Sequence, residues 1–118
     1  MNTHEMVQKL SESFASCTNI LTAIGDETRQ YLILEMMKIG KCSGVRVCEI
    51  TSRTNLSRPA VSHHLQIMKN AGIVKVRKKG TKNYYYFDPG MESFGKLVKT
   101  LELAMSISKQ MPNRSETN

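Results

Sequence analysis

The stretch LSRPAVSHHLQIMKN, residues 56–70, decides the fold of this chain. Ser57 is a favoured N-cap residue and Pro59 costs no intrahelical hydrogen bond in a first turn, so the pattern predicts a helix over 57–70. At 100° per residue its apolar side chains fall on one arc: Val61, Leu65 and Met68. The opposite arc carries donors, acceptors and positive charge, which is the chemistry that a helix in the major groove of DNA uses.

The candidate DNA contacts of this helix lie on that polar arc or in the first turn. They are Ser57, Arg58, Pro59, Ser62, His63, Gln66 and Lys69. We expect them to contact base edges or adjacent phosphates. His64 falls in the apolar arc, where a packed core histidine is the favoured interpretation.

Three helices are predicted before residue 57. The first runs from a cap at Asn2 or Thr3 to Gly25, because apolar residues recur at helical spacing: Met6, Leu10, Phe14, Cys17, Leu21 and Ile24. The second, over 26–40, is apolar around most of its circumference, which predicts a buried helix. A short third helix is expected over 47–53, and residues 54–56 form the tight connection to the helix over 57–70.

The pattern changes period after Gly72. Residues 73–78 and 83–87 are rich in β-branched or aromatic side chains around a turn over 79–82, which predicts a two-stranded hairpin, the wing over 74–87. Its basic residues are expected to contact phosphate or the minor groove: Arg77, Lys78, Lys79 and Lys82. Tyr85 and Phe87 share the face assigned to the core, and a last amphipathic helix extends to about residue 109.

These elements predict a mainly α-helical fold with a small β-hairpin, a winged helix-turn-helix of five helices and a two-stranded wing. The chain has 118 residues, which is enough for one domain. Residues 1–110 would form a DNA-binding and dimerisation domain, and the polar residues 111–118 a disordered tail.

Charge favours a nucleic-acid partner. The chain carries a net charge of +7, and the segment 38–82 holds eleven basic residues and one acidic residue. No stretch approaches the ~18 to 20 apolar residues of a membrane span, and the N-terminus lacks the pattern of a secretory signal, so a cytoplasmic protein without a membrane partner is expected. No catalytic arrangement of carboxylates, cysteine and histidine was found, which predicts that the chain is not an enzyme.

The motifs themselves closely resemble those of a known family. Residues 25–29 (GDETR), 56–65 (LSRPAVSHHL) and 71–74 (AGIV) are similar to the ArsR/SmtB family of small bacterial transcriptional repressors. The resemblance implies a homodimer built from the first and last helices, with two reading helices in successive major grooves of operator DNA. It also implies, for many members, release by a metal or redox signal.

The apolar stripes of the first and last helices fit such a homodimer, because a small DNA-binding core cannot cover both. The expected interface residues are Met6, Leu10, Phe14, Leu21, Phe94, Leu97, Leu101 and Met105. The alternative is that the two stripes pack on each other within one protomer.

Neither metal site of the family is expected. At the first, Arg46 stands where the family has a thiolate and only Cys48 remains; at the second, the matching positions are Pro89, Met91, Glu102 and Met105. No metal and no cofactor are therefore predicted. Cys42 and Cys48 are candidates for a thiol or metalloid sensor, since the basic residues around them favour thiolate, whereas Cys17 lies on an apolar stripe and is interpreted as a small core residue.

The remaining alternative is a winged-helix module that contacts protein or RNA. The basic segment 38–82 argues against protein contacts. The lack of an aromatic stacking platform argues against single strands. A homodimeric regulator, reading duplex operator DNA through the helix over 57–70 and contacting the backbone or minor groove through the wing over 74–87, remains the favoured function.

Overall fold

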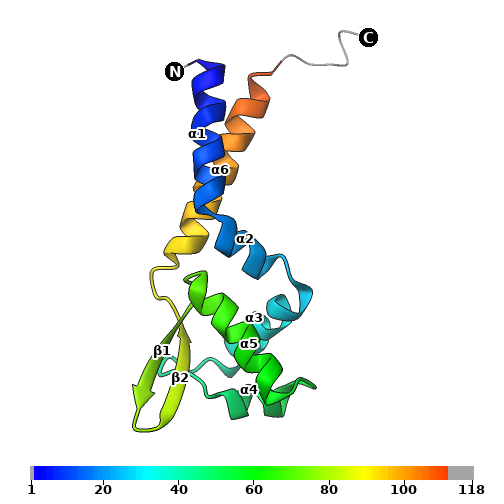
Figure 1. Cartoon of the computed structure of the whole chain (residues 1–118), viewed down its shortest axis with the longest axis vertical. Coiled ribbons are helices and arrows are strands. Elements are labelled where there is room, and N and C mark those ends of the chain that lie inside the picture. The colour runs from blue at the N-terminus through cyan, green and yellow to red at the C-terminus, as the bar shows by residue number, and fades with distance from the viewer. Residues whose placement is uncertain (1, 112–118) are drawn as a thin grey trace.

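The computed structural model describes residues 2–111 and has six helices and one hairpin in that range (Figure 1). The elements are α1 (Thr3–Ser16), α2 (Thr18–Ile24), α3 (Glu27–Ile39), α4 (Val47–Arg53), α5 (Arg58–Asn70), β1 (Val74–Lys79), β2 (Lys82–Phe87) and α6 (Glu92–Lys109). The predicted mainly α-helical winged helix-turn-helix fold is confirmed. Apart from Met111, the predicted tail 111–118 lies outside the described residues. None of the helices in this range has the length and apolar character needed to span a bilayer.

The single helix predicted up to Gly25 is wrong, because the chain breaks at Cys17 into α1 and α2. The hydroxyls of Ser16 and Thr18 donate to the carbonyls of Ser13 and Ala15 at 2.7 and 3.1 Å, so side chains replace main-chain partners at the break. Cys17 itself is fully buried. The break turns the chain from the direction of α1 into that of α2 and raises the helix count from the predicted five to six.

The bounds of α3, α4 and α5 agree with the prediction, because side-chain and glycine caps fix them. The Asp26 carboxylate accepts from the Arg29 amide at 3.0 Å, and the Ser57 hydroxyl accepts from the Ala60 amide at 3.2 Å. Gly40 ends α3 with φ +65°, in the left-handed region. The burial predicted for this helix is found on one face only, with Leu32 and Met36 in the core, and apolar side chains of another face are exposed: Tyr31, Leu34 and Met37.

The hairpin pairs β1 with β2 in antiparallel register from Val74 opposite Phe87 to Lys79 opposite Lys82. Only Gly80 and Thr81 therefore form the turn, which is shorter than predicted. Tyr85 exchanges two hydrogen bonds of 2.8 Å with Val45, which ties the loop before α4 to the hairpin. Tyr85 and Phe87 pack against the core as predicted.

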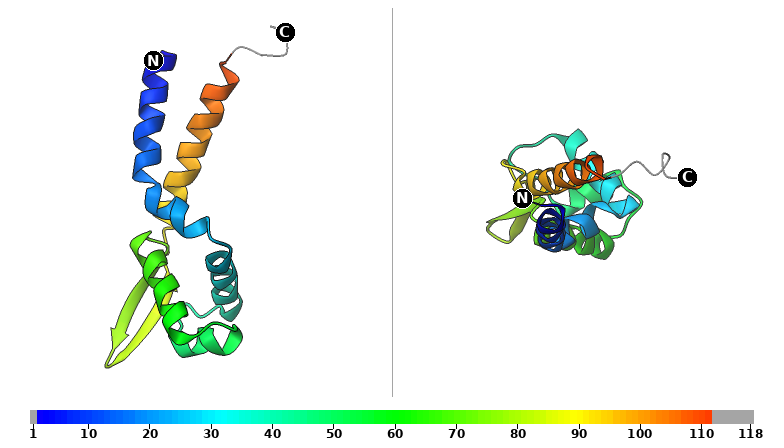
Figure 2. Two further views of the ribbon diagram at one scale, coloured as in Figure 1. Left: turned by 45° about the vertical axis from the view of Figure 1, so that its right-hand side comes forward. Right: turned by 90° about the horizontal axis from the view of Figure 1, so that it is seen from above.

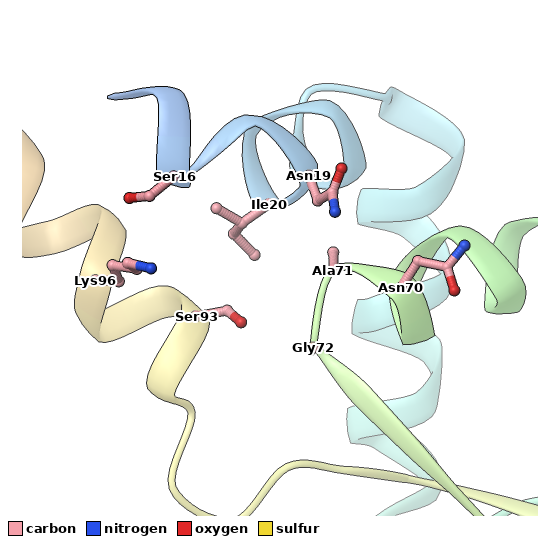
Figure 3. A pocket seen from close by; sticks show the side chains of 8 residues that line it. All are labelled: Ser16, Asn19, Ile20, Asn70, Ala71, Gly72, Ser93 and Lys96. Atoms are coloured by element: carbon pink, nitrogen blue, oxygen red, sulfur yellow. The ribbon is translucent and has the colours of Figure 1, made fainter. Parts of the chain in front are cut away.

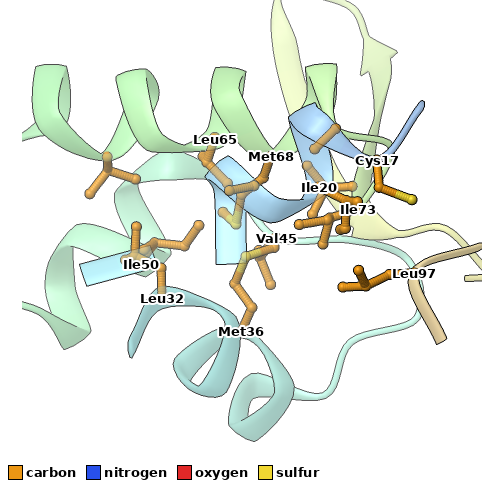
Figure 4. Packing of buried hydrophobic residues seen from close by; sticks show 14 residues of the cluster. Cys17, Ile20, Leu32, Met36, Val45, Ile50, Leu65, Met68, Ile73 and Leu97 are labelled. Atoms are coloured by element: carbon orange, nitrogen blue, oxygen red, sulfur yellow. The ribbon is translucent and has the colours of Figure 1, made fainter. Parts of the chain in front are cut away.

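The core joins α2, α3, α4, α5, β1 and, through Leu97, the start of α6 (Figure 4). Its largest fully buried side chains include Leu32, Ile50, Leu65, Met68 and Ile73. These residues hold the helix-turn-helix and the hairpin in one unit, so the orientation of α5 is fixed by packing from three sides.

Helices α1 and α6 project from this unit as a pair that lies side by side (Figures 1 and 2), and we call this pair the stalk. Not one side chain of α1 is buried. The radius of gyration is 18.6 Å, whereas a compact domain of this length has about 13.5 Å. The stalk therefore exposes apolar surface that a single protomer does not cover.

Candidate nucleic-acid interface

Helix α5 has the two faces that its sequence predicts. Val61, Leu65 and Met68 are buried against the core. All seven predicted DNA contacts of this helix and its cap are exposed: Ser57, Arg58, Pro59, Ser62, His63, Gln66 and Lys69. Along its whole length α5 thus exposes polar and basic side chains to solvent, while its apolar side chains pack against the core.

Two of these side chains already have partners within the protomer. The Ser57 hydroxyl caps α5 and leaves its own proton free to donate. The Gln66 amide donates to Oδ1 of Asn70 at 3.0 Å, which orients both side chains along the exposed face. Asn70 was not among the predicted contacts, although its place on the same arc of the helix marks it as one.

The basic residues of the hairpin occupy two different places. Lys78, Lys79 and Lys82 are exposed beside the turn, and within residues 2–111 none of them forms an ion pair. Arg77 is also exposed, but its guanidinium donates to the carbonyl of Ser43 and lies 5.9 Å from the centre of the Tyr84 ring. Arg77 therefore holds the hairpin to the loop before α4, and the three lysines are free to meet an anion.

A buried arginine of α3, which was not among the predicted site residues, contacts α5 from the core side. Arg29 of α3 donates to the carbonyls of Ala23 and Thr22, both at 2.8 Å. Its third donor group faces Nδ1 of His64 at 3.3 Å. Burial lowers the pKa of His64, and the nearby Asp26 carboxylate opposes that shift. The available signal was a cation on the same face of α3 as Leu32 and Met36.

The predicted dimer residues are divided by the fold. Leu97 is buried within the protomer, which places it in the core. Met6, Leu10 and Phe94 are half-buried. The other four are exposed on α1, α2 and α6: Phe14, Leu21, Leu101 and Met105. Helix α1 does pack on α6 within one protomer, as the intramolecular alternative predicts. This packing still leaves these four apolar side chains exposed to solvent.

The three cysteines lie in different surroundings. Cys17 is buried, whereas Cys42 and Cys48 are exposed. Cys42 lines a largely apolar cavity of about 400 Å³ between the end of α3 and β2, together with Met36, Met37, Tyr86, Phe87 and Pro89. Lys41 binds the Glu49 carboxylate at 2.7 Å, so its ammonium group is engaged with a carboxylate and not with a thiolate. Among residues 2–111 no cluster of three or more His, Cys, Asp or Glu could hold a metal.

A second cavity, of about 240 Å³, lies where the stalk meets the C-terminal end of α5 (Figure 3). Its lining is mainly polar: Ser16, Asn19, Ile20, Asn70, Ala71, Gly72, Ser93 and Lys96. Side chains from α1, α2 and α6 face the end of α5 across this space. The stalk and the helix-turn-helix are therefore less tightly packed here than inside the core.

The sequence is similar to those of known transcriptional regulators. The model of the family described as bacterial regulatory protein, arsR family, matches residues 26–76. An uncharacterized HTH-type transcriptional regulator of Methanocaldococcus jannaschii is 38% identical over 91 residues, which cover 76% of this chain and 99% of that protein. The transcriptional repressor SdpR of Bacillus subtilis is 37% identical over 67 residues, covering 57% of this chain and 70% of the repressor.

Solved structures share the fold. The crystal structure of an ArsR family transcriptional regulator, RHA00566, superposes with a TM-score of 0.67 at 16% identity, covering 86% of this chain and 96% of that one. A possible transcriptional regulator for arsenical resistance superposes with a TM-score of 0.56 at 26% identity, covering 78% and 96%. The exposed polar face of α5 and the lysines of the hairpin thus lie on a fold that known transcriptional regulators use.

Proposed function

Since the chain belongs to the ArsR family of bacterial regulatory proteins, we propose that it is a homodimeric, sequence-specific repressor of transcription. The family consists of DNA-binding transcriptional regulators and not of enzymes. In the proposed complex α5 lies in the major groove, and the hairpin contacts the backbone or the minor groove. The protein would act in the cytoplasm, where its operator DNA lies.

The division of α5 into two faces carries this proposal. Ser62, His63 and Gln66 are exposed on the side opposite the buried Val61 and Leu65. Hydroxyl, imidazole and carboxamide groups can donate to and accept from base edges, which is what sequence reading requires. The lysines beside the hairpin turn add charge for phosphate, which raises affinity without adding sequence preference.

The stalk supports the homodimer. Leu101 and Met105 of α6 are exposed together with Phe14 of α1, so apolar side chains of both helices face solvent in the protomer. A second copy, related by a two-fold axis, would bury these side chains with the same side chains of its own stalk. Two copies would then present two α5 helices to successive major grooves, about 34 Å apart.

Selection of duplexes from a random library, followed by filter binding, tests this function. We expect enrichment of a two-fold symmetric site whose half-sites are about 10 to 10.5 base pairs apart. The controls are the selected sequence as a single strand and as duplex RNA, which should bind more weakly at the same salt concentration. Absence of an enriched duplex, or equal binding of the controls, would contradict the proposal and favour a module for protein or RNA contacts.

A thiol- or metalloid-responsive repressor is the second candidate, and the position of Cys42 favours it. The thiol lines the cavity beside Tyr86 and Phe87, so a group attached to it would compete for space with the base of the hairpin. Cys48 is exposed nearby along the chain, at the start of α4. Modification at these positions would couple a thiol reaction to the placement of the hairpin and of α5.

The test is titration of the DNA complex with arsenite, cadmium, peroxide and polysulfide. Wild type should release DNA with at least one of them, and a variant with both Cys42→Ser and Cys48→Ser should not. Zinc, cobalt and nickel are the comparison ions and should not release DNA, because they prefer histidine and carboxylate sets that the matching positions lack. Equal responses of wild type and the double variant would exclude sensing by these cysteines.

A further inference from the structure

His64 of α5 contacts Arg29 of α3 at the back of the proposed reading helix. Nη1 of Arg29 lies 3.3 Å from Nδ1 of His64. His64 is half-buried, and the ring of the adjacent, exposed His63 lies 5.8 Å from its own, centre to centre. The contact therefore joins α5 to α3 through one pair of polar atoms.

Contacts other than the one with His64 hold the side chain of Arg29 in place. Its side chain is buried, and the residue is 7% exposed. Nε and Nη2 donate to the carbonyls of Ala23 and Thr22 at the end of α2, and the Asp26 carboxylate lies 3.8 Å from Nη2. Two hydrogen bonds and an ion pair thus hold the guanidinium plane, and Nη1 points to His64 as a donor of defined direction.

This geometry determines the state of the imidazole. A guanidinium only donates and does not lose its proton in proteins, so Nδ1 of His64 must offer a lone pair. The ring is then neutral and carries its proton on Nε2. In a protonated ring, the Nδ1–H donor of His64 would face the N–H donor of Arg29, and two positive charges would lie next to each other.

The charged groups around His64 favour the neutral ring. Burial lowers its pKa most; the Arg29 and His63 charges lower it further, and the Asp26 carboxylate raises it. Helix α2, which packs against α5, brings no ionisable side chain, while Glu49 and Arg53 of α4 are engaged with Lys41 and Glu35. Because the folded pKa lies below the ordinary 6.5, the contact is complete above that pH and is lost as the pH falls through the lowered value.

We propose that neutral His64 is a positioning residue, which aligns α5 for operator DNA by accepting a hydrogen bond from Arg29, and that its protonation weakens operator binding. This inference rests on the proposed function of α5. Core packing still holds α5 when the contact is lost, but one fixed point between α5 and α3 is gone, so the orientation of Ser62, His63 and Gln66 is less closely defined. Two adjacent histidines then act in opposite directions, because protonation of the exposed His63 adds positive charge facing the phosphates.

His64→Asn is the variant that separates these effects. Its Oδ1 occupies the place of Nδ1 and accepts from Arg29, but it does not titrate. Phenylalanine at the same position keeps the ring shape and removes the acceptor. To remove the opposing effect of His63, the comparison uses His63→Asn as the common background for His64, His64→Asn and His64→Phe.

Operator affinity is measured from pH 7.5 to pH 5.5 at constant salt. In the His63→Asn background, affinity should fall about tenfold with acidification when His64 is present, because the DNA-binding conformation favours the neutral ring. With His64→Asn it should stay constant to within about threefold, and with His64→Phe it should be low at both pH values. An equal acid-side loss with His64→Asn would overturn the inference.

A measurement on the wild-type protein without DNA tests the Arg29–His64 contact independently of operator binding. Nitrogen chemical shifts of the imidazole should show Nδ1 unprotonated at pH 7.5, with a titration midpoint below 6.5. A proton on Nδ1 at pH 7.5, or a midpoint at or above 6.5, would exclude the contact as described. If no variant binds duplex DNA while the titration is as expected, the proposed function fails and the Arg29–His64 contact stands.

Discussion

Oγ1 of Thr100, in the middle of α6, lies 3.5 Å from Sγ of Cys17, the residue at which α1 ends. The same hydroxyl pairs with Oγ of Ser13 and donates to the carbonyl of Lys96 at 2.9 Å. Thr100 is buried, so this polar cluster fixes α1 against α6 at the base of the stalk.

Replacing Thr100 by valine should lower the free energy of unfolding by about 1 kcal/mol, because a buried hydroxyl loses its cross-helix partners while the shape is kept. Urea denaturation at one fixed protein concentration measures it. The control is Thr51→Val, since the Thr51 hydroxyl bonds only the carbonyl of Cys48 in its own helix. A loss of equal size in both variants would mean that the cluster adds nothing to the packing of the stalk.

Replacing Gln66 or Ser62 by alanine should weaken binding to the selected operator by ~1 to 3 kcal/mol for each base contact removed. Binding to random duplex should change little, and the unfolding transition should stay the same because both side chains are exposed. Filter binding with both duplexes gives the two affinities. Wild-type affinity for the operator in both variants would show that this face of α5 is not the reading face.

Replacing Lys79 and Lys82 together by alanine should make the dependence of log K on log salt shallower by roughly 1 to 2 units, because each phosphate contact releases counterions. The change should be the same for operator and random duplex. Lys109→Ala, on the last turn of α6, is the matched control and should leave the slope unchanged. If the slope does not differ between the hairpin variant and wild type, the hairpin does not contact the backbone.

Replacing Met105 by glutamate should dissociate the proposed dimer and reduce operator affinity, because a charge would be buried between the two stalks. Leu34→Glu is the matched control: the two residues are 60% and 57% exposed, but Leu34 lies on α3, away from the stalk. Sedimentation velocity should find a monomer for the first variant and a dimer for the second. The opposite result would place the dimer interface on α3.

Glu49 should make stability depend on acid pH. Its carboxylate accepts from Lys41 at 2.7 Å and from the Arg46 amide at 3.2 Å, and these bonds, that of Lys41 first, hold its pKa below the ordinary value of 4.5. Its contribution is therefore complete above pH 4.5 and is lost as the pH falls through the lowered pKa.

Glu49→Gln should accordingly cost about 0.5 to 1 kcal/mol at pH 7, a small value because the pair is solvent-exposed. The difference from wild type should shrink as the pH falls below 4.5. Urea denaturation across this range measures it, with the exposed Glu12→Gln as the control. A difference that does not depend on pH would assign the effect of the substitution to packing.

Local signals in the sequence predicted much of the fold. The caps Asp26, Gly40 and Ser57 fixed the ends of α3 and the start of α5, because each acts on residues within one turn. The burial of Val61 and Leu65 followed from helical period alone. The exposed face of α5 was predicted for the same reason.

Features that depend on distant residues were missed. The break at Cys17 occurs against Thr100, which is far away in sequence, while the apolar period continues through the break without a change. The role of Arg29 depends on where α5 comes to lie. Its place on the same face of α3 as Leu32 and Met36 indicates burial, but no local pattern indicates His64 as its partner. Arg77 was predicted from its charge alone, which does not reveal that Ser43 lies within its reach.

The form of the molecule has a mechanical consequence. The helix-turn-helix unit is joined to the stalk by only two stretches of chain, at Cys17 and at residues 88–91, beside the polar cavity of Figure 3. A rotation of about 6° at this junction moves a point about 30 Å away by about 3 Å, close to the 3.4 Å rise of one base pair. In the proposed dimer such a rotation at one junction moves the α5 helix of that copy by about one base pair, so small changes of angle there alter the half-site separation that two copies can span.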